Sequence, residues 1–559
     1  MKTFAATLHF YSPKAYDFVQ RSFINILPHP STIRKWYYSI DGSPGISQPA
    51  LDCLTKKARE AIEKNHTILC GLQIDDMSIK KQIDFNGKEY IGFINFGTKL
   101  DSDELPLAKE VVVIMAVAIN EHWKIPVAYY FIDALTARNR ANIITNVLKS
   151  IHETGIDIIL LTFDGPQYNF TMANILGAQL QVDKELQVFF LHPITKKRIY
   201  IILDACHMIK LVRNCFAEYK VIQNKNNEEI QYDFVQKLIR IQEKYGLHVN
   251  TKVRLRHLNW YNEKMKVCLA VQVLSNSVSK GMQYLRESIK LPEFANSKAT
   301  EEFCLMFNDI FDVLNSRNKF CITPSRQPIT TKNLTEITQK INCFIDYISS
   351  LKYQGVSILH SKRKTGFFGL IITLNSIVGI FKNWIQENSN MSYFLTYKLS
   401  QDVLELFFSA VRNHCGHNNN PTCTQFMAVF KKLLTHAQVS GSKYANSVAL
   451  DDTIFLNITS TNIHKDNIDN ICIIEENDIN ILNNNINYDH SYNIHALFEV
   501  INKDYINNVL GYIAGFIVRK ISKDLSCNVC LTLLHSDTTF SKLQHLKSRG
   551  GLINVSADV

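Results

Sequence analysis

Short apolar runs rich in Val, Ile and Tyr alternate with turns across residues 67–163, and their lengths predict β-strands. We expect strands at 67–74, 90–96, the double run 111–119 and 125–132, and 156–163. Before the last strand, apolar residues at helical spacing predict one helix: Ile143, Ile144, Val147, Leu148 and Ile151. The resulting order, β-β-β-α-β, matches an RNase H-like fold, in which the first and fourth strands lie side by side.

An acidic residue follows each of the two strands that such a fold brings together. Asp75 and Asp76 come directly after the first strand, and Asp164 comes after the fourth. A third acid, Glu405, lies in an amphipathic helix expected over 399–412. Its polar stripe is formed by Asp402, Glu405, Ser409 and Arg412.

The other segments divide the chain further. Residues 8–40 predict two short helices, with Ser31 as the N-cap of the second, and this pair suits a helix-turn-helix DNA contact. An ordinary helical hairpin is an equally good reading of the same pattern. Asn-rich residues 457–495 predict a flexible loop, because their composition cannot form a core, and 509–521 resumes a helical pattern.

The predicted fold is therefore an α/β RNase H-like catalytic domain interrupted by a large, mostly α-helical insertion domain, after a small N-terminal helix-turn-helix-like segment. The expected boundaries are 1–62 for the DNA-binding segment, 63–204 and 399–456 for the two RNase H-like parts, 205–398 for the insertion, 457–495 for the low-complexity loop and 496–559 for a C-terminal helical segment.

Composition narrows the function classes. The 559 residues carry a formal charge of +10, which favours a polyanionic partner without proving one. No leader-like N-terminus and no uninterrupted apolar run of about 18 residues occur, so no membrane partner is expected. The 13 scattered cysteines fit reduced thiols better than a disulfide framework.

Three converging carboxylates suit phosphodiester chemistry. Two Mg²⁺ ions about 4 Å apart activate an oxygen nucleophile and shield charge on the phosphate and leaving oxygen. Mg²⁺ needs only a few carboxylate oxygens, and Asp75, Asp164 and Glu405 fit that need, with Asp76 as a possible substitute. Any one acid at a strand end is usually a solvated loop residue, so spacing alone leaves this trio a weak hypothesis.

Motifs around Asp75, Asp164 and Glu405 strengthen the hypothesis that these three acids form a catalytic site. In order along the chain they are FYSPKAY (10–16), LPHPSTIRKW (27–36), DDMSIKKQ (75–82), DACHMIKLVRN (204–214), KMKV (264–267), AVQVLS (270–275), SKRKTGF (361–367), SQDVLELFFS (400–409), NNNPT (418–422) and GYIAG (511–515). From about residue 8 to 530 the chain resembles the P-element-type DNA transposases, including those that carry a THAP zinc finger.

The resemblance implies a DDE/D-type transposase that cleaves transposon ends and joins them to target DNA in the nucleus, as a homo-oligomer on double-stranded DNA. Its catalytic acids fall on Asp75, Asp164 and Glu405, which would also hold the metal. It further implies GTP as a cofactor that is not hydrolysed, held by Lys252, Lys266, Val267, Ser275, Asn308, Asp309 and Asp402. Asp312 competes with Asn308 and Asp309 for the guanine position.

Candidate DNA contacts are Arg34 and Lys35 on the second helix and the basic run Lys362, Arg363 and Lys364, whose default reading is a solvated turn. Cys527 and Cys530 have zinc-ligand spacing, with His535 or His545 as further candidates, although only one Cys pair is visible. His207 would orient a phosphate or a water, or it is a satisfied structural histidine.

One departure from the family bears on activity. The family usually begins with a zinc-binding THAP domain, whereas this chain opens where the helix-turn-helix is expected. That leaves three hypotheses: an active transposase, a domesticated DNA-binding remnant or regulator that no longer cuts, and a simple RNase H-like nuclease without GTP. The long helical insertion argues against the third.

Overall fold

The computed structural model describes residues 4–556 except for 6–7, 10–11, 23–25, 39–40, 86, 88, 98–104, 247–250, 322, 387–390, 416–417, 435–453, 457–502, 523–524, 526, 537–540 and 548–551. The Asn-rich segment predicted at 457–495 therefore lies outside the described residues.

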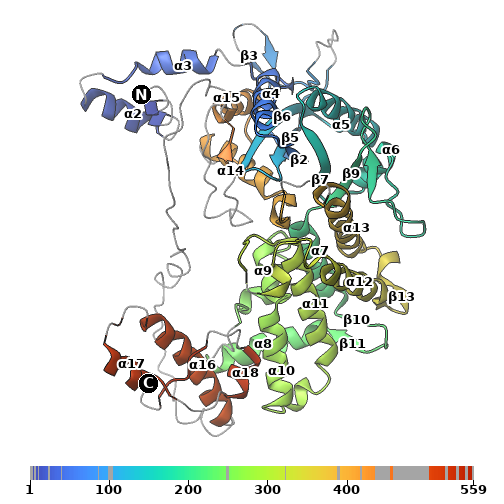
Figure 1. The fold of residues 1–559 in the computed structure, drawn as a ribbon, viewed down its shortest axis with the longest axis vertical. Coiled ribbons are helices and arrows are strands. Elements are labelled where there is room, and N and C mark those ends of the chain that lie inside the picture. The colour runs from blue at the N-terminus through green and yellow to red at the C-terminus, as the bar shows by residue number, and fades with distance from the viewer. Residues whose placement is uncertain are drawn as a thin grey trace.

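A mixed eight-stranded sheet forms the centre of the upper body in Figure 1, in the order β1-β6-β5-β2-β7-β9-β8, with β14 beside β6. Its strands are β1 (Gly45–Ile46), β2 (Leu69–Ser78), β5 (Glu110–Ala118), β6 (Trp123–Ile132), β7 (Asp157–Phe163), β8 (Phe189–Leu191), β9 (Arg198–Leu203) and β14 (Ile454–Phe455). Strand β2 pairs antiparallel with β5 and parallel with β7. The adjacency predicted for the strands that precede Asp75 and Asp164 is confirmed, and the order β-β-β-α-β is formed by β2, β5, β6, α5 (Ala137–His152) and β7.

Helices cover both faces of this sheet, because the strands are apolar on both. On one face lie α4 (Gln48–Glu63), α5 (Ala137–His152) and, against α5, α6 (Gln167–Leu176). On the other lie α14 (Asp402–His414) and α15 (Cys423–Leu434). There Tyr129 of β6 packs 4.5 Å from the ring of Phe430 and 5.1 Å from that of Phe426. Each such buried ring stabilises the fold by roughly 1.5–3 kcal/mol.

Three local predictions were wrong. Strand β2 does not stop before the acids but continues through them to Ser78, because the β5 ladder pairs Asp75 with Val113 and Asp76 with Val112. The strand expected at 90–96 is reduced to β4 (Tyr90–Ile91), which pairs with β3 (Asp84–Phe85) in a separate hairpin. The helix expected from residue 399 starts at Asp402, after a 3₁₀ turn over Thr396–Leu399.

The insertion is mostly helical, as predicted, with a small four-stranded sheet β11-β10-β12-β13 added. Its elements are α7 (Ala205–Tyr219), β10 (Val221–Gln223), β11 (Glu229–Gln231), α8 (Tyr232–Tyr245), α9 (Val267–Val273), α10 (Asn276–Glu287), α11 (Lys298–Leu314), α12 (Leu334–Ser350), β12 (Lys352–Tyr353), β13 (Val356–Ser357) and α13 (Thr365–Ile380). In Figure 1 these green and yellow elements lie below the sheet.

Helix α13 joins the insertion to the sheet. Its Thr373 hydroxyl accepts from the Leu203 amide at 2.9 Å and lies 3.0 Å from the Leu203 carbonyl, so α13 is fastened along β9. By length and composition, Thr365–Ile385 is the one helix among the described residues that would suffice to cross a membrane, but 72% of its apolar window is buried in the protein. Its apolarity is therefore that of a core helix.

The ends of the chain form two smaller helical groups. Near the N-terminus, α2 (Pro13–Ser22) and α3 (Pro30–Tyr38) close over Tyr16, Leu27 and Ile33. Helix α3 begins at Pro30, so Ser31 lies inside its first turn and the predicted N-cap was wrong. Near the C-terminus, α16 (Lys503–Ile521), α17 (Asn528–Leu534) and α18 (Lys542–Lys547) form the red group in Figure 1, with α18 against α10.

Candidate active site

The β2–β7 ladder brings Asp75 and Asp164 to one edge and one face of the sheet. In that ladder Gln73 is paired with Thr162. Asp75 lies two residues further along β2, and Asp164 directly follows the end of β7, two residues after Thr162. Residues two apart on a strand point to the same face. The adjacency that the sequence predicted for these two acids is therefore present in the structure.

The segment that leads into α14 is fixed to the same face. The Gln73 side-chain amide donates to the Lys398 carbonyl at 3.3 Å, and the Thr162 hydroxyl donates to the Leu399 carbonyl at 3.0 Å. The Gln401 side-chain amide donates to the Ile74 carbonyl at 2.7 Å. These side chains are fully buried, where each lost hydrogen bond costs about 1–3 kcal/mol. The start of α14 is thus fixed to both strands that carry the acids.

Glu405 stands in the first turn of α14, held there by the packing of that helix. Val403, Leu404 and Phe407 are buried against β5, β6 and α15, which turns the stripe with Asp402 and Glu405 toward the strand ends. The stripe is not the solvent-exposed face that its polarity suggests, because Asp402 and Ser409 are buried. Glu405 itself is half-buried.

Electrostatics shows how closely the acids converge. Burial, and then the negative charge of Asp164, raise the pKa of Asp75 to about 8. Burial also raises the pKa of Asp164. Burial lowers the pKa of Arg412, and the charges of Asp75 and Glu405 act against that shift. Asp75 and Glu405 therefore both act on the same neighbour, Arg412.

His207 faces these acids from the first turn of α7. Its Nδ1 lies 2.7 Å from Oδ2 of Asp204, and the same carboxylate caps α7 by accepting from the His207 amide at 2.8 Å. Asp204 also accepts from the Gln401 amide at 3.0 Å, so it ties α7 to α14. Burial opposes charge on His207, but the Asp204 hydrogen bond prevails and raises its pKa. His207 is thus both structurally anchored and adjacent to the acids.

Asp76 is directed away from Asp75 by the strand pleat. Arg140 of α5 binds it with two hydrogen bonds, from Nη1 to Oδ1 at 3.1 Å and from Nη2 to Oδ2 at 2.6 Å. Both of its carboxylate oxygens are therefore engaged in a buried ion pair. From the sequence, Asp76 was a possible substitute for Asp75 as a metal ligand. In the structure, Asp76 instead binds Arg140 and so holds α5 on the sheet.

The residues present suit a hard divalent cation. Asp75 and Asp164 supply only carboxylate oxygens, which Mg²⁺ prefers. A cation between them would offset the burial and the repulsion from Asp164 that together raise the pKa of Asp75. Within the described part of the chain, however, no three His, Cys, Asp or Glu side chains are close enough to hold a metal as they stand. Glu405 approaches the two strand acids without closing a three-ligand site.

Some of the residues predicted to bind GTP, called the GTP set below, lie close together in the insertion. Ser275 caps α10, and the next amide, of Asn276, donates to Oδ1 of Asn308 at 3.1 Å. The Asn308 amide in turn donates to Asp309 at 3.1 Å and to Asp312 at 3.2 Å. Asp309 also lies 3.4 Å from Nζ of Lys340.

The other members of the GTP set are more scattered. Lys266 and Val267 stand at the start of α9, where the Val267 side chain is buried and leaves only its main chain to meet a ligand. Lys252 is exposed. Asp402 belongs to α14 and accepts from Nη2 of Arg317 at 3.1 Å. Arg317 follows α11, the helix of Asn308 and Asp309, so this ion pair links the insertion to the catalytic helix.

The remaining candidates are at the surface. Lys35 is exposed on α3, and Arg34 lies among the side chains that are not described. Lys362, Arg363 and Lys364 are exposed before α13, and Arg363 is engaged by Glu218. Cys527 and Cys530 are exposed thiols at the start of α17, and the described residues bring neither His535 nor His545 into a three-ligand group with them. The zinc hypothesis therefore gains no support.

Sequence reasoning missed the residues that assemble this site. Gln73 and Thr162 are polar residues inside apolar runs, a signal that marks buried hydrogen-bonding partners, whereas Gln401 lies in a polar stretch that gives no such signal. Arg317 lies in a polar loop with nothing in the sequence to connect it to Asp402. Such long-range pairs follow from the tertiary fold alone.

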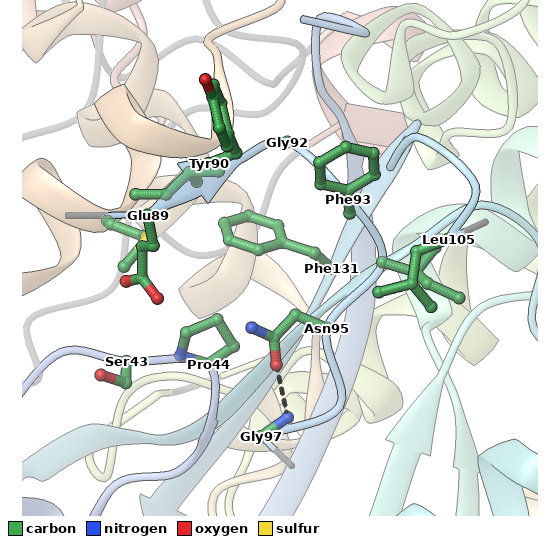
Figure 2. A pocket seen from close by; sticks show the side chains of 13 residues that line it. Ser43, Pro44, Glu89, Tyr90, Gly92, Phe93, Asn95, Gly97, Leu105 and Phe131 are labelled. Atoms are coloured by element: carbon green, nitrogen blue, oxygen red, sulfur yellow. Dashed lines mark hydrogen bonds between the residues drawn. The ribbon is translucent and has the colours of Figure 1, made fainter. Parts of the chain in front are cut away.

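A hollow of about 480 Å³ lies elsewhere, between the 89–97 stretch and the sheet (Figure 2). Figure 2 shows Phe131, Pro44 and Phe93 around it, with Asn95 accepting a hydrogen bond from the Gly97 amide at 2.8 Å. None of Asp75, Asp164 and Glu405 lines this hollow, so it is separate from the candidate active site.

Comparison with known families accounts for most of the chain. Family models match at residues 1–36 (Transposable element P transposase-like, HTH domain), 42–177 (TNP-like, RNase H N-terminal domain), 206–327 (TNP-like, GTP-binding insertion domain), 397–431 (TNP-like, RNase H C-terminal domain) and 501–559 (DNA transposase THAP9, C-terminal domain). The RNase H matches flank the insertion match, as the predicted interruption requires.

Two curated relatives are similar over long stretches. The human DNA transposase THAP9 is 28% identical over 579 residues, covering 99% of this chain and 61% of the relative. The Drosophila melanogaster transposable element P transposase is 25% identical over 439 residues, covering 77% of this chain and 53% of the relative. The chain thus spans just over half the length of these relatives.

A solved structure shares the fold. The Drosophila P element transposase strand transfer complex aligns with a TM-score of 0.62 and 24% identity, over 77% of this chain and 90% of that one.

Proposed function

Because this chain belongs to the P-element-type transposase family, we propose that it cleaves transposon ends and joins them to target DNA in a metal-dependent reaction. The observation that carries the proposal is the convergence of Asp75, Asp164 and the start of α14 on one edge of the RNase H-like sheet. Joining DNA requires an attacking oxygen and charge stabilisation at one phosphate, and carboxylates gathered at one point supply the framework for both.

Each acid has a distinct place in this proposal. Asp75 and Asp164 would hold Mg²⁺ between adjacent strands, and Glu405 would complete the site from α14. The bound ions would activate the attacking hydroxyl and shield the charge that develops on the phosphate. His207, held by Asp204, would donate its second ring N–H toward a phosphate oxygen near the acids. Gln73, Thr162 and Gln401 would keep α14 in register with the strands.

GTP is the cofactor that the insertion would bind without hydrolysing it. The Asn276 amide, directly after Ser275, joins the start of α10 to Asn308, which in turn binds Asp309 on α11. An Asp carboxylate can accept from guanine N1–H and its exocyclic amine. Lys252, Lys266 and Val267 would meet the phosphates. The Arg317–Asp402 ion pair gives the occupied insertion a direct route to the helix of Glu405.

DNA would be held by several basic surfaces. The helical pair α2–α3, with Lys35 exposed, would act as a helix-turn-helix on double-stranded ends, and Lys362 and Lys364 would contact backbone phosphates. Since cut-and-paste joining acts on two ends, a homo-oligomer is the expected assembly, and the nucleus is the expected location.

The test is strand transfer of pre-cut terminal fragments, from the element that encodes the chain, into supercoiled plasmid. Joining should require both Mg²⁺ and GTP, and a GTP analogue that resists hydrolysis should support it equally well. No joining from a folded protein that still binds GTP and DNA would instead identify a domesticated remnant or regulator. Joining that ignores GTP would exclude the cofactor role.

A further inference from the structure

A second hollow, of about 370 Å³, opens directly beside Asp164. One face of α7 forms its wall: His207, Lys210, Leu211, Asn214 and Glu218 line it at steps of three to four residues. The opposite side is formed by the loop after Asp164, by Lys264 and Met265, and by Lys362, Arg363 and Thr365. None of the residues assigned to GTP lines it. The hollow therefore touches the candidate active site at Asp164 without including any residue of the GTP set.

Its lining is unusually cationic for a cavity that touches a catalytic acid. Lys210 is only 4% exposed and lines the hollow. Burial lowers its pKa, while the charges of Asp204, Glu405 and Asp164 act against that shift. Because Lys210 lines the hollow, its ammonium group offers a positive charge to an anionic ligand there, beside Asp164.

The rim adds an aromatic platform and a second cation. Nζ of Lys264 lies 3.6 Å from the ring centroid of Tyr261, which is 68% exposed. The main chain at this rim is fixed, because Asn214 donates to the Lys264 carbonyl at 3.2 Å while its own Oδ1 is buried without a partner. Cations beside an exposed aromatic ring are the usual lining of sites for single-stranded nucleic acid.

Resting on the proposed function, we propose that this hollow binds the nucleotide next to the reacting phosphate as single-stranded DNA, with Lys210 on its phosphate, Lys264 on the following phosphate and Tyr261 beneath a base. A cavity of this size accepts a nucleotide but no duplex. The strand would have to leave the duplex before entering, which places strand separation at the ends ahead of chemistry.

Glu218 restrains this site. It binds Arg363 through two hydrogen bonds, from Nε at 3.2 Å and from Nη2 at 2.5 Å, and both residues line the hollow. In the free protein the Arg363 guanidinium is thus neutralised by a carboxylate rather than offered to DNA. Loss of the Glu218 charge should release Arg363 for a phosphate.

The test is binding of 5′-fluorescein-labelled decathymidylate to the full chain, measured by anisotropy in EDTA over a series of salt concentrations. Lys210→Met and Lys264→Met should each weaken binding about tenfold, as expected for a lost charge-assisted contact, and reduce the salt slope by about 0.7. Lys237→Met, on α8 and outside the hollow, removes the same charge and should leave both quantities unchanged.

Glu218→Gln is the complementary variant, because the inference predicts that it binds the oligonucleotide more tightly, a result that misfolding would not produce. It should tighten binding and steepen the salt slope as Arg363 becomes available. Equal affinity and slope in wild type, Lys210→Met, Lys264→Met and Glu218→Gln would overturn the inference. If the oligonucleotide binds no variant while plasmid joining persists, the inference fails and the proposed function stands. If joining is absent as well, both fail.

Discussion

Two neighbouring carboxylates illustrate how the same residue type takes different roles within one strand. Asp75 and Asp76 differ in position by one pleat, so the first faces α14 and the second faces α5. Nothing in the local sequence separates them; only the registered pairing with β5 and β7 does. The sequence favoured Asp75 over Asp76 because its motif resembles a family, not because strand chemistry singled it out.

Asp76→Asn should destabilise the protein by about 3 kcal/mol, since it leaves the 4%-exposed Arg140 side chain without its charge partner. Thermal unfolding in EDTA measures this. The matched control is Lys57→Gln, which breaks an ion pair on the surface of α4 and should cost about 0–1 kcal/mol. Equal losses for the two variants would show that the Asp76–Arg140 pair is not structurally important.

Asp75→Asn, unlike Asp76→Asn, should stabilise the metal-free protein. Burial and Asp164 disfavour a charge at this position, as the pKa of about 8 shows, so the amide should raise the melting temperature of the metal-free protein at pH 8 by a few degrees. The same variant should abolish joining. A lower melting temperature in EDTA would contradict the electrostatic account of the two acids.

At the scale of elements, the strands and helices followed from hydrophobic periodicity, whereas their ends did not. Strand β2 extends beyond its apolar run because the β5 ladder continues to pair it past Ile74. Helix α14 starts late because residues 396–399 form a 3₁₀ turn whose carbonyls are taken by Gln73 and Thr162. Such boundaries depend on partners far away in the sequence, which no local pattern contains.

Thr162→Val is the most conservative test of this attachment, because it keeps the shape and removes one buried donor. It leaves the Leu399 carbonyl without its hydrogen bond, which should cost about 1–3 kcal/mol and reduce joining while DNA binding is retained. Thr171→Val, which removes a hydroxyl from the exposed side of α6, serves as the control. Unchanged joining in Thr162→Val would show that this contact does not position α14.

The insertion and the sheet meet at Asp402, and this contact carries a pH dependence. Burial, and then Asp204, raise the pKa of Asp402 from 3.8 to about 6. The folded protein then holds more protons than the unfolded chain between these values. The contribution of this group to stability is therefore full below about pH 4 and falls as pH rises through 6.

Asp402→Asn should remove that dependence while keeping an acceptor for Arg317. Its stability relative to wild type should increase from pH 4.5 to pH 6.5, by about 3 kcal/mol at most. Melting temperatures at the two pH values test the sign. A relative stability that decreases over this range would show that Asp402 is held as a carboxylate by Arg317.

At the scale of the whole molecule, a helical insertion of nearly two hundred residues separates Glu405 in sequence from the strands that carry Asp75 and Asp164. The separation is bridged by α13 along β9, by Asp204 between α7 and α14, and by Arg317 between α11 and α14. Occupation of the insertion can therefore alter the approach of Glu405 to the two strand acids. In the proposed function, this arrangement is the route by which a nucleotide bound in the insertion would act on Glu405 without being hydrolysed.

The most direct test of the central claim is joining of pre-cut ends to plasmid by Glu405→Ala, with Mg²⁺ and GTP present. The control is Glu185→Ala, an exposed acid in the loop before β8. The account predicts that joining disappears in Glu405→Ala, with GTP and DNA binding intact, and is unaffected in Glu185→Ala. Joining by Glu405→Ala at the wild-type rate would contradict it, because the site would then work without its third acid.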